Sequence, residues 1–309
     1  MTADWPPTVT PHGRCLHLLD FITACWFGIF GACIGSFLNV VAYRLPRRMS
    51  VVWKPSHCPQ CGHDIRARDN VPILGWLLLR GRCRDCRAAI SPRYAIVEAL
   101  MAATFVLLAY VEVFSGGANL VGGPLIEATG AWELISNPPW PLLEAYAFHV
   151  TLLSLLMAAA LIALDDEIAP LSLIGFAVIV VVAVTLRWRL DHHTPFPAAG
   201  GPRAGIEAAL GFAVGVLAAL VASQVVPYKD IAERERRRNN LALALGSTGG
   251  FLGLSPLMTV AALAAALAGA CCAARRTPQD FFRTLPASIF AAALVHIALW
   301  KQFDAWGLP

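Results

Sequence analysis

Residues 56–98 read SHCPQCGHDIRARDNVPILGWLLLRGRCRDCRAAISPRYAIVE and contain two Cys-x-x-Cys pairs. Cys58 and Cys61 form the first pair, Cys83 and Cys86 form the second, and twenty-one residues separate the two. Thiolates at this spacing can surround one tetrahedral Zn²⁺ with protein ligands only. The alternative is a pair of disulfides, which would need an oxidising compartment. Because a closed four-cysteine site leaves no coordination position for a substrate, we expect a structural zinc.

The composition around this stretch is that of a membrane protein. Hydrophobic residues make up 57% of the chain and charged residues 14%, against about a quarter charged in soluble domains. A spanning helix needs roughly 20 apolar residues, and eight segments are candidates: 16–43, 94–114, 142–164, 168–186, 206–227, 241–255, 256–273 and 287–303. We therefore predict an all-α polytopic membrane protein with about eight transmembrane helices and a small zinc-stapled loop domain.

Positive charge gathers on one side of this topology. If the first helix runs from outside to inside, the inside loops are 44–93, 165–167, 228–240 and 274–286, and they hold 19 of the 24 Lys and Arg residues. The positive-inside rule then places the cysteine loop in the cytosol. A cytosolic loop favours zinc over disulfides.

Small and polar residues mark further expected contacts. Gly31-x-x-x-Gly35, followed by Ser36, predicts that another helix approaches the first one closely. Asn39, near the inner end of that helix, is expected to bond a neighbour. His192 and His193 lie in an outer loop beside Asp191, where they can bind a metal or simply be solvated.

Acidic residues at membrane depth are the candidates for chemistry. Three follow the third span at its cytosolic end: Asp165, Asp166 and Glu167. They can mark an interfacial helix turn, or Asp165 or Asp166 can be half of an aspartic-protease pair, in which two carboxylates share a proton. The segment 228–240 offers weak partners among its five basic residues: Asp230, Glu233 and Glu235. Such a run is typical of a solvated, headgroup-facing segment.

Residues 31–46, GACIGSFLNVVAYRLP, together with residues 56–98 resemble the bacterial type IV prepilin leader peptidases, which also carry N-methyltransferase activity. The resemblance implies a tail over 1–15, a first span over 16–43, a cytosolic zinc-binding domain over 44–93, and a bundle over 94–309 that is peptidase-like from about 142. It also implies a bacterial inner-membrane location, prepilin or type II secretion pseudopilin substrates, the lipid bilayer and pilus or secretion assembly proteins as partners, and no nucleic acid. S-adenosylmethionine would be the methyl donor.

The sequence departs from both aspartate motifs of that family. Its first motif, Asp-x-x-x-x-x-(Leu/Ile)-Pro, counted back from Pro170 reaches Ala163, so Asp165 or Asp166 fits only a shortened turn. Its second, Gly-x-Gly-Asp-x-Lys, is absent, and two placements put Arg238 or Arg203 at the aspartate. An arginine stays protonated at neutral pH.

Two functions therefore remain open from the sequence. The first is an enzyme that trims prepilin-like leaders and methylates the new N-terminus, with cleavage weak or lost unless an acid of 228–240 substitutes. The second is a non-catalytic relative that binds prepilin-like helices or the assembly platform. Gly81, beside Cys83, is a candidate for methyl transfer by resemblance and otherwise a turn glycine, and the chain contains no glycine-rich nucleotide fingerprint.

Overall fold

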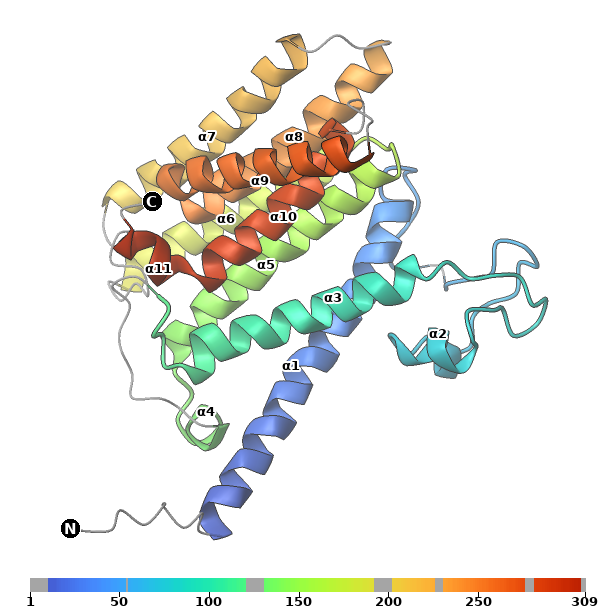
Figure 1. Cartoon of the computed structure of the whole chain (residues 1–309), viewed down its shortest axis with the longest axis horizontal. Coiled ribbons are helices and arrows are strands. Elements are labelled where there is room, and N and C mark those ends of the chain that lie inside the picture. The colour runs from blue at the N-terminus through green and yellow to red at the C-terminus, as the bar shows by residue number, and fades with distance from the viewer. Residues whose placement is uncertain are drawn as a thin grey trace.

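The computed structural model describes residues 11–53, 55–120, 131–191, 202–225, 230–275 and 281–306. Long helices form a bundle, and the cysteine loop projects from one end of it (Figure 1). The main helices are α1 (Pro11–Arg44), α3 (Arg93–Leu108), α5 (Trp140–Leu164), α6 (Leu171–Asp191), α7 (Pro202–Val225), α8 (Ile231–Leu252), α9 (Leu254–Arg275) and α10 (Phe281–Ala298). Shorter elements are the 3₁₀ turn η1 (Ala67–Asp69), α2 (Leu74–Leu78), the π-helix η2 (Ala109–Phe114), α4 (Ala131–Ser136) and α11 (Trp300–Ala305). No strand forms among the described residues, so the all-helical prediction is confirmed.

Six described helical segments are long and apolar enough to cross a membrane: Leu18–Arg44, Arg93–Phe114, Trp140–Leu164, Ile206–Gln224, Pro256–Ala273 and Phe281–Ala298. They correspond to six of the eight predicted spans. The predicted span 168–186 lies in α6, where the described apolar stretch is the shorter Leu171–Ala183.

The predicted loop 228–240 and predicted span 241–255 need correction. Most of both belongs to one helix, α8, which begins at Ile231 and runs through the basic residues into the apolar ones. The helix starts there because the Asp230 side chain accepts a hydrogen bond from the amide of Glu233, an N-cap. The reversal between α8 and α9 falls at Gly253, whose φ of 93° suits glycine. The apolar pattern located the turn but missed the polar first half of the helix.

The predicted close approach along α1 is confirmed, and α3 is the helix that makes it. A Cβ added at Gly31 would lie 2.6 Å from the carbonyl oxygen of Met101, and one at Gly35 would lie 2.9 Å from Cα of Glu98. Both distances are shorter than side chains tolerate, so glycine lets the two backbones touch. This contact fixes α1 and α3 as the pair that carries the cysteine loop between them.

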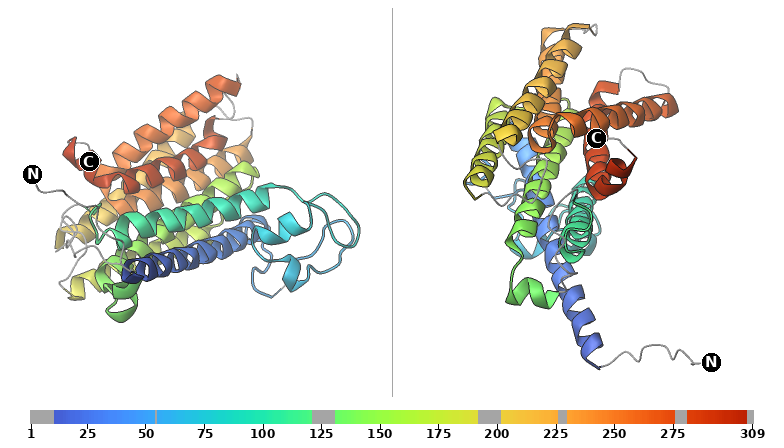
Figure 2. Two further views of the ribbon diagram at one scale, coloured as in Figure 1. Left: turned by 60° about the horizontal axis from the view of Figure 1, so that its bottom comes forward. Right: turned by 90° about the vertical axis from the view of Figure 1, so that its left-hand side faces the viewer.

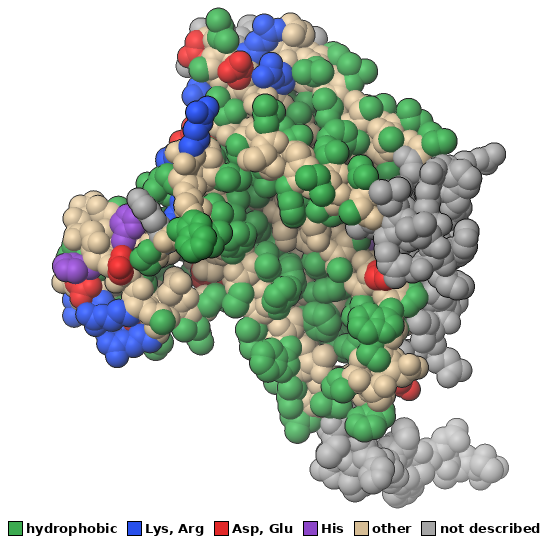
Figure 3. Space-filling model, turned by 180° about the vertical axis from the view of Figure 1, so that it is seen from behind, with side chains coloured by type: hydrophobic (Ala, Val, Ile, Leu, Met, Phe, Trp, Pro, Cys, Tyr) green, Lys and Arg blue, Asp and Glu red, His purple; other side chains and the backbone are tan. Residues whose placement is uncertain are grey.

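The cysteine loop projects from an end of the bundle at which several helices terminate. The C-terminal end of α1, the N-terminal end of α3 and the C-terminal end of α5 meet where the cysteine loop emerges (Figures 1 and 2). On the face in Figure 3, basic side chains collect at this end and hydrophobic side chains cover most of the rest. Exposed hydrophobic residues of α1 include Phe21, Trp26 and Phe30, as expected for a surface that faces lipid.

A buried polar pair lies toward the other end of the bundle. Glu112, in the π-helix η2, and His149, in α5, are both 0% exposed, and their Oε1 and Nδ1 atoms are 2.7 Å apart. The ring of Trp300 lies against the rings of His149 and of the fully buried His296 from α10. Irregular π turns are often found where a helix carries a functional or strained residue. The pair connects α3 to α5 inside the apolar core.

Candidate functional site

The cysteine loop contains two knuckles with the same backbone plan. The first spans Ser56–Ile65 and the second spans Gly81–Ile90. In each, the amide of the last residue donates to the carbonyl of the first at 2.7 Å, and the second and ninth residues form an isolated β-bridge. The amide of the first cysteine donates to the carbonyl five residues later, at 2.9 Å and 2.8 Å. The two segments share only their cysteines and the final isoleucine, so the repeat lies in the backbone more than in the sequence.

All four predicted ligands come together. The sulfur atoms of Cys58, Cys61, Cys83 and Cys86 lie within 4.8 Å of one another, and none of them forms a disulfide. Zn–S bonds of about 2.3 Å in a tetrahedron require sulfur–sulfur separations of about 3.8 Å, and the Cys58 and Cys86 sulfurs are 3.8 Å apart. The donor set therefore fits a zinc ion held entirely by protein, in the closed form typical of structural sites.

The first knuckle also favours a thiolate. The amides of Cys61 and Gln60 donate to the Cys58 sulfur and lower the pKa of that thiol from 9.0 to about 6. A thiolate is the form of cysteine that binds a metal. Burial and hydrogen bonds with the neighbouring sulfurs raise the pKa of the Cys61 thiol to about 12, so the first knuckle favours a thiolate at Cys58 alone.

The residue after the second cysteine of each knuckle has a left-handed backbone, and it is a glycine in only one of the two. Gly62 in the first has φ 74°, and its counterpart in the second, Arg87, has φ 62°. Left-handed backbone costs an L-residue about 1–2 kcal/mol, partly offset by the greater entropy of unfolded glycine. We expect Arg87→Gly to stabilise the loop by up to about 1 kcal/mol, measured as a higher chelator concentration needed to release the metal. Gly62→Ala is the converse change. Nothing lies within 4 Å of the added Cβ, so a loss of stability in this variant would report the cost of the left-handed backbone and not a steric clash. An unchanged chelator midpoint in Arg87→Gly would contradict the argument.

The predicted acids Asp165 and Asp166, with Glu167, form the turn that ends α5. Asp165 pairs with Arg93 of α3 through both carboxylate oxygens, and the second contact is 3.0 Å. Asp166 has φ 55° and lies 3.4 Å from Arg283 of α10. The turn thus binds arginines from two other helices.

Two further contacts complete this turn. The Glu167 carboxylate lies 2.7 Å from Arg47, just after α1. The buried side chain of Asn240, in α8, accepts from the amide of Ala169 at 2.8 Å and donates to the carbonyl of Glu167 at 3.0 Å. We name residues 165–169 the acid turn. Through these contacts it ties α1, α3, α8 and α10 to the end of α5.

The weak substitutes for a second aspartate lie on the first turns of α8. Asp230 caps the helix, Glu233 pairs with Arg237 one turn later, and Glu235 is exposed. Arg238, which one motif placement puts at the family's aspartate, bonds its neighbour Asn239. Within the described ranges, each acid of the acid turn pairs with an arginine rather than with a second carboxylate. A catalytic role for Asp165, Asp166, Asp230, Glu233 or Glu235 stays a prediction.

The structure accounts for two of the other predicted candidates, Asn39 and Gly81. Asn39 donates to the carbonyl of Tyr94 at the start of α3, as expected of a helix-to-helix contact. Gly81 has φ 66°, and a Cβ there would lie 2.9 Å from the Trp76 ring, which accounts for glycine by conformation and packing; its role in methyl transfer stays a prediction. His192 and His193 lie outside the described residues.

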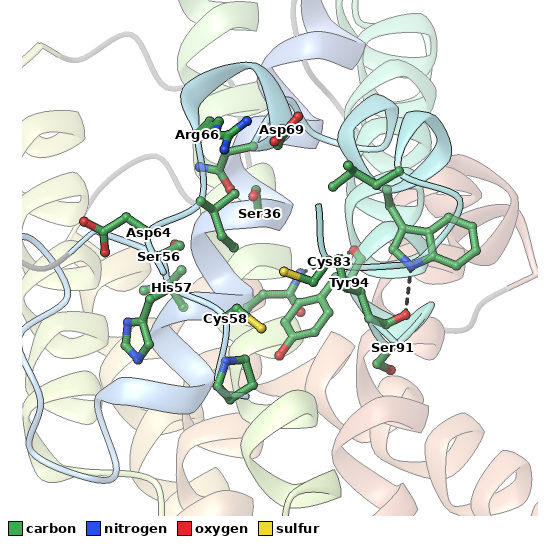
Figure 4. A pocket seen from close by; sticks show the side chains of 18 of the residues that line it. Ser36, Ser56, His57, Cys58, Asp64, Arg66, Asp69, Cys83, Ser91 and Tyr94 are labelled. Carbon is green, nitrogen blue, oxygen red and sulfur yellow. Dashed lines mark hydrogen bonds between the residues drawn. The ribbon is translucent and has the colours of Figure 1, made fainter. Parts of the chain in front are cut away.

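A pocket that the sequence did not predict lies between the cysteine loop and the inner halves of α1 and α3. It has a volume of about 770 Å³, within the range of small-molecule sites. Figure 4 shows the side chains of Ser36, Cys58, Cys83 and Tyr94 around it. Glu98 also lines it, one turn after Tyr94 on α3. The only signal in the sequence was the dense set of polar residues flanking both cysteine pairs.

Comparison with known proteins assigns this part of the chain. Residues 29–112 match the family model described as the bacterial peptidase A24 N-terminal domain. The match covers the inner half of α1, the cysteine loop and α3, and it ends before the acid turn. This defines a membrane protein with a peptidase-type N-terminal domain. Over these residues, the chain is similar to prepilin leader peptidases and N-methyltransferases.

Curated relatives agree over the same region. The chain is 45% identical over 109 residues to the type 4 prepilin-like proteins leader peptide-processing enzyme of Escherichia coli O78:H11, covering 29% of this chain and 40% of that protein. Over 82 residues it is 48% identical to the prepilin leader peptidase/N-methyltransferase of Myxococcus xanthus, covering 26% and 24%. Over 112 residues it is 40% identical to that of Klebsiella pneumoniae, covering 34% and 48%. The chain thus spans less than half the length of these relatives, and no solved structure matches it.

Proposed function

We propose that this protein acts on type IV prepilins or type II secretion pseudopilins at the membrane face that carries the cysteine loop, in the bacterial inner membrane. The observation that carries the proposal is the domain match over residues 29–112, which includes all four cysteines and all the residues that line the pocket. The excess of Lys and Arg on that side supports a cytosolic position for the loop. A prepilin-like segment in the bilayer would meet this end of the bundle.

We assign methyl transfer to the pocket and expect peptide cleavage to be weak or lost. S-adenosylmethionine would lie among the residues that line the pocket, with Tyr94, Trp76 and Glu98 as contacts, and would supply the methyl group. The four cysteines fit a zinc ion that would hold the loop over α1 and α3. Cleavage by an aspartic mechanism needs two carboxylates that share a proton. Among the described residues, Asp165 forms its ion pair with Arg93 rather than meeting a second carboxylate.

A non-catalytic relative is the second candidate. The absence of Gly-x-Gly-Asp and the arginine partners of the acid turn favour it for the peptidase step. Such a protein would bind prepilin-like helices or the pilus or secretion assembly platform without cutting. The two candidates differ in whether a methyl group reaches the substrate.

Separate assays of cleavage and methylation distinguish these functions. In membranes with a prepilin substrate, we expect leader removal at least about 100-fold slower than by an active homologue, since a lost general acid or base costs about that much or more. With a pilin whose leader is already removed and labelled S-adenosylmethionine, we expect methylation above the background of empty membranes. Cleavage at the homologue's rate would refute the degenerate peptidase site. Absence of methylation beside an active homologue would refute the methyl-transfer assignment and favour the binding role.

A further inference from the structure

Glu98 is a buried carboxylate at the membrane end of the pocket. It is 8% exposed on α3, and its Oε2 atom accepts a hydrogen bond from the amide of Ile73 at 2.6 Å. Among the described residues, no ion pair joins Glu98 to a cation. A carboxylate removed from water is costly unless a charge or several hydrogen bonds compensate it. One amide satisfies only part of its accepting capacity.

The amide that holds Glu98 belongs to a strained turn. Ile73 has φ 62° and ψ −55°, and the amide of Leu74 donates to the carbonyl of Pro72 at 2.6 Å. This is the rarer hand of the γ-turn, and a β-branched residue there is a genuine conformational outlier. Strain of this kind persists only where the surroundings over-determine it, and it clusters at ligand sites. Here its result is a carboxylate fixed in position on the pocket wall.

The positive charges that line the pocket do not compensate Glu98. Three arginines line it, and each has other partners: Arg84 binds Asp69, Arg66 binds Asp85, and Arg44 donates to the carbonyls of Ser50 and Pro55. The Arg84 contact is bidentate, with Nε 2.7 Å from the carboxylate. These pairings leave the pocket with a fixed carboxylate at its membrane end, rather than a uniformly positive lining.

Aromatic rings add a second feature that suits a cation. Tyr94 and Trp76 line the same pocket as Glu98. Trp76 is held in place because its Nε1 donates to the carbonyl of Ile90 at 3.0 Å. Aromatic faces attract ammonium and related cations through the ring quadrupole. A fixed carboxylate with aromatic walls is the combination that such ligands select.

We propose that this pocket binds an organic cation, an ammonium or sulfonium group, and that Glu98 is its counter-ion. The proposal deepens the proposed function and rests on it for the two sources of that charge. One source is the sulfonium of a methyl donor, and the other is the free N-terminal amine of a processed substrate. Both present a compact positive centre beside apolar groups. Glu98 would recognise the positive charge, and the aromatic rings would contact the apolar groups around it.

The test compares cationic and neutral ligands on the full-length protein in lipid nanodiscs with its metal retained. One arm sets S-adenosylmethionine against S-adenosylhomocysteine, which lacks the sulfonium charge. The other sets a short apolar peptide with a free N-terminal amine against its N-acetylated form. We expect the wild type to prefer the charged member of at least one pair by about tenfold, the equivalent of one charge-assisted hydrogen bond. The arm that shows the preference identifies the source.

Glu98→Gln should reduce that preference to near unity. The amide oxygen can still accept from Ile73, so metal content and thermal unfolding should remain those of the wild type. Glu133→Gln, which neutralises an exposed acid on α4, is the matched control and should keep the preference. If the Gln variant does not fold, carbodiimide labelling of wild-type Glu98 replaces it, and the charged ligand should protect the carboxylate. A preference that persists in Glu98→Gln, no charge preference in the wild type, or no protection would overturn the proposal. Methylation by the wild type alongside any of these results would leave the proposed function intact.

Discussion

Removing the metal from the four-cysteine site is expected to unfold the cysteine loop while the helical bundle stays folded. The loop contains two isolated bridges and short turns, and its buried hydrophobic residues are chiefly Cys58 and Cys83. The large core lies among the helices instead. Structural zinc supplies about 10–16 kcal/mol in small zinc-dependent folds, far more than these few contacts. Chelation or Cys83→Ser should therefore open residues 56–91 to trypsin at its arginines.

The matched control is Cys271→Ser, which removes an exposed cysteine of α9 and should leave the loop protected. Far-UV circular dichroism should show little loss of helix in the chelated protein, because the loop contributes only a short helix and a turn. Trypsin resistance that survives metal removal would show that the loop folds without it.

Lowering the pH should also weaken metal binding and destabilise the cysteine loop. The Cys58 thiol has a pKa of about 6 in the folded loop against an ordinary 9.0. Its contribution to stability is therefore complete above about pH 9 and declines as the pH falls toward 6. The chelator concentration needed to release the metal should accordingly fall as the pH is lowered, because protons compete with the metal for the cysteine sulfurs. A chelator midpoint that does not change with pH would contradict this assignment.

Breaking the Glu112–His149 pair is expected to destabilise the bundle by about 3 kcal/mol, since removal of His149 leaves the Glu112 carboxylate buried without this contact. Both side chains are 0% exposed, so water cannot substitute. His149→Phe and Glu112→Leu should each lower the midpoint of thermal unfolding in nanodiscs.

The double variant separates pairing from packing. If the cost arises from the orphaned partner, Glu112→Leu with His149→Phe should be less destabilised than the sum of the single variants, and a favourable coupling should appear in the cycle. The matched control is Glu144→Gln, an acid elsewhere on α5 that is only partly buried. Strictly additive losses would show that the two residues act through packing alone.

Local patterns predicted the features that depend on local chemistry. The Cys-x-x-Cys spacing predicted that the four cysteines gather, and Gly31 and Gly35 predicted the close approach of α1 to another helix, because both follow from residues near one another in the chain. Apolar length located six spans. It failed for α8, whose helix is begun by the cap at Asp230 and runs through charged residues before its apolar half.

Features built from distant segments were not predictable in this way. The arginine partners of the acid turn come from α3, α10 and the segment after α1, so their meeting depends on helix packing. Glu112 lies within a predicted apolar span, and its contact with His149 depends on the packing of α5 against that span. Glu98 ends the stretch that carries the cysteine pairs, and only the strained turn at Ile73 and the pocket give it a role.

The acid turn changes how substitutions of its members must be interpreted. Asp165, Asp166 and Glu167 each form an ion pair that links a different segment to the end of α5. An alanine at any of these positions would therefore destabilise the bundle, whether or not the native acid takes part in chemistry. A variant with unchanged stability and activity would exclude both a structural and a catalytic role. A loss of activity alone would not tell which of the two roles was lost. The anchorage also gives these acids a structural role in a chain that lacks the Gly-x-Gly-Asp motif.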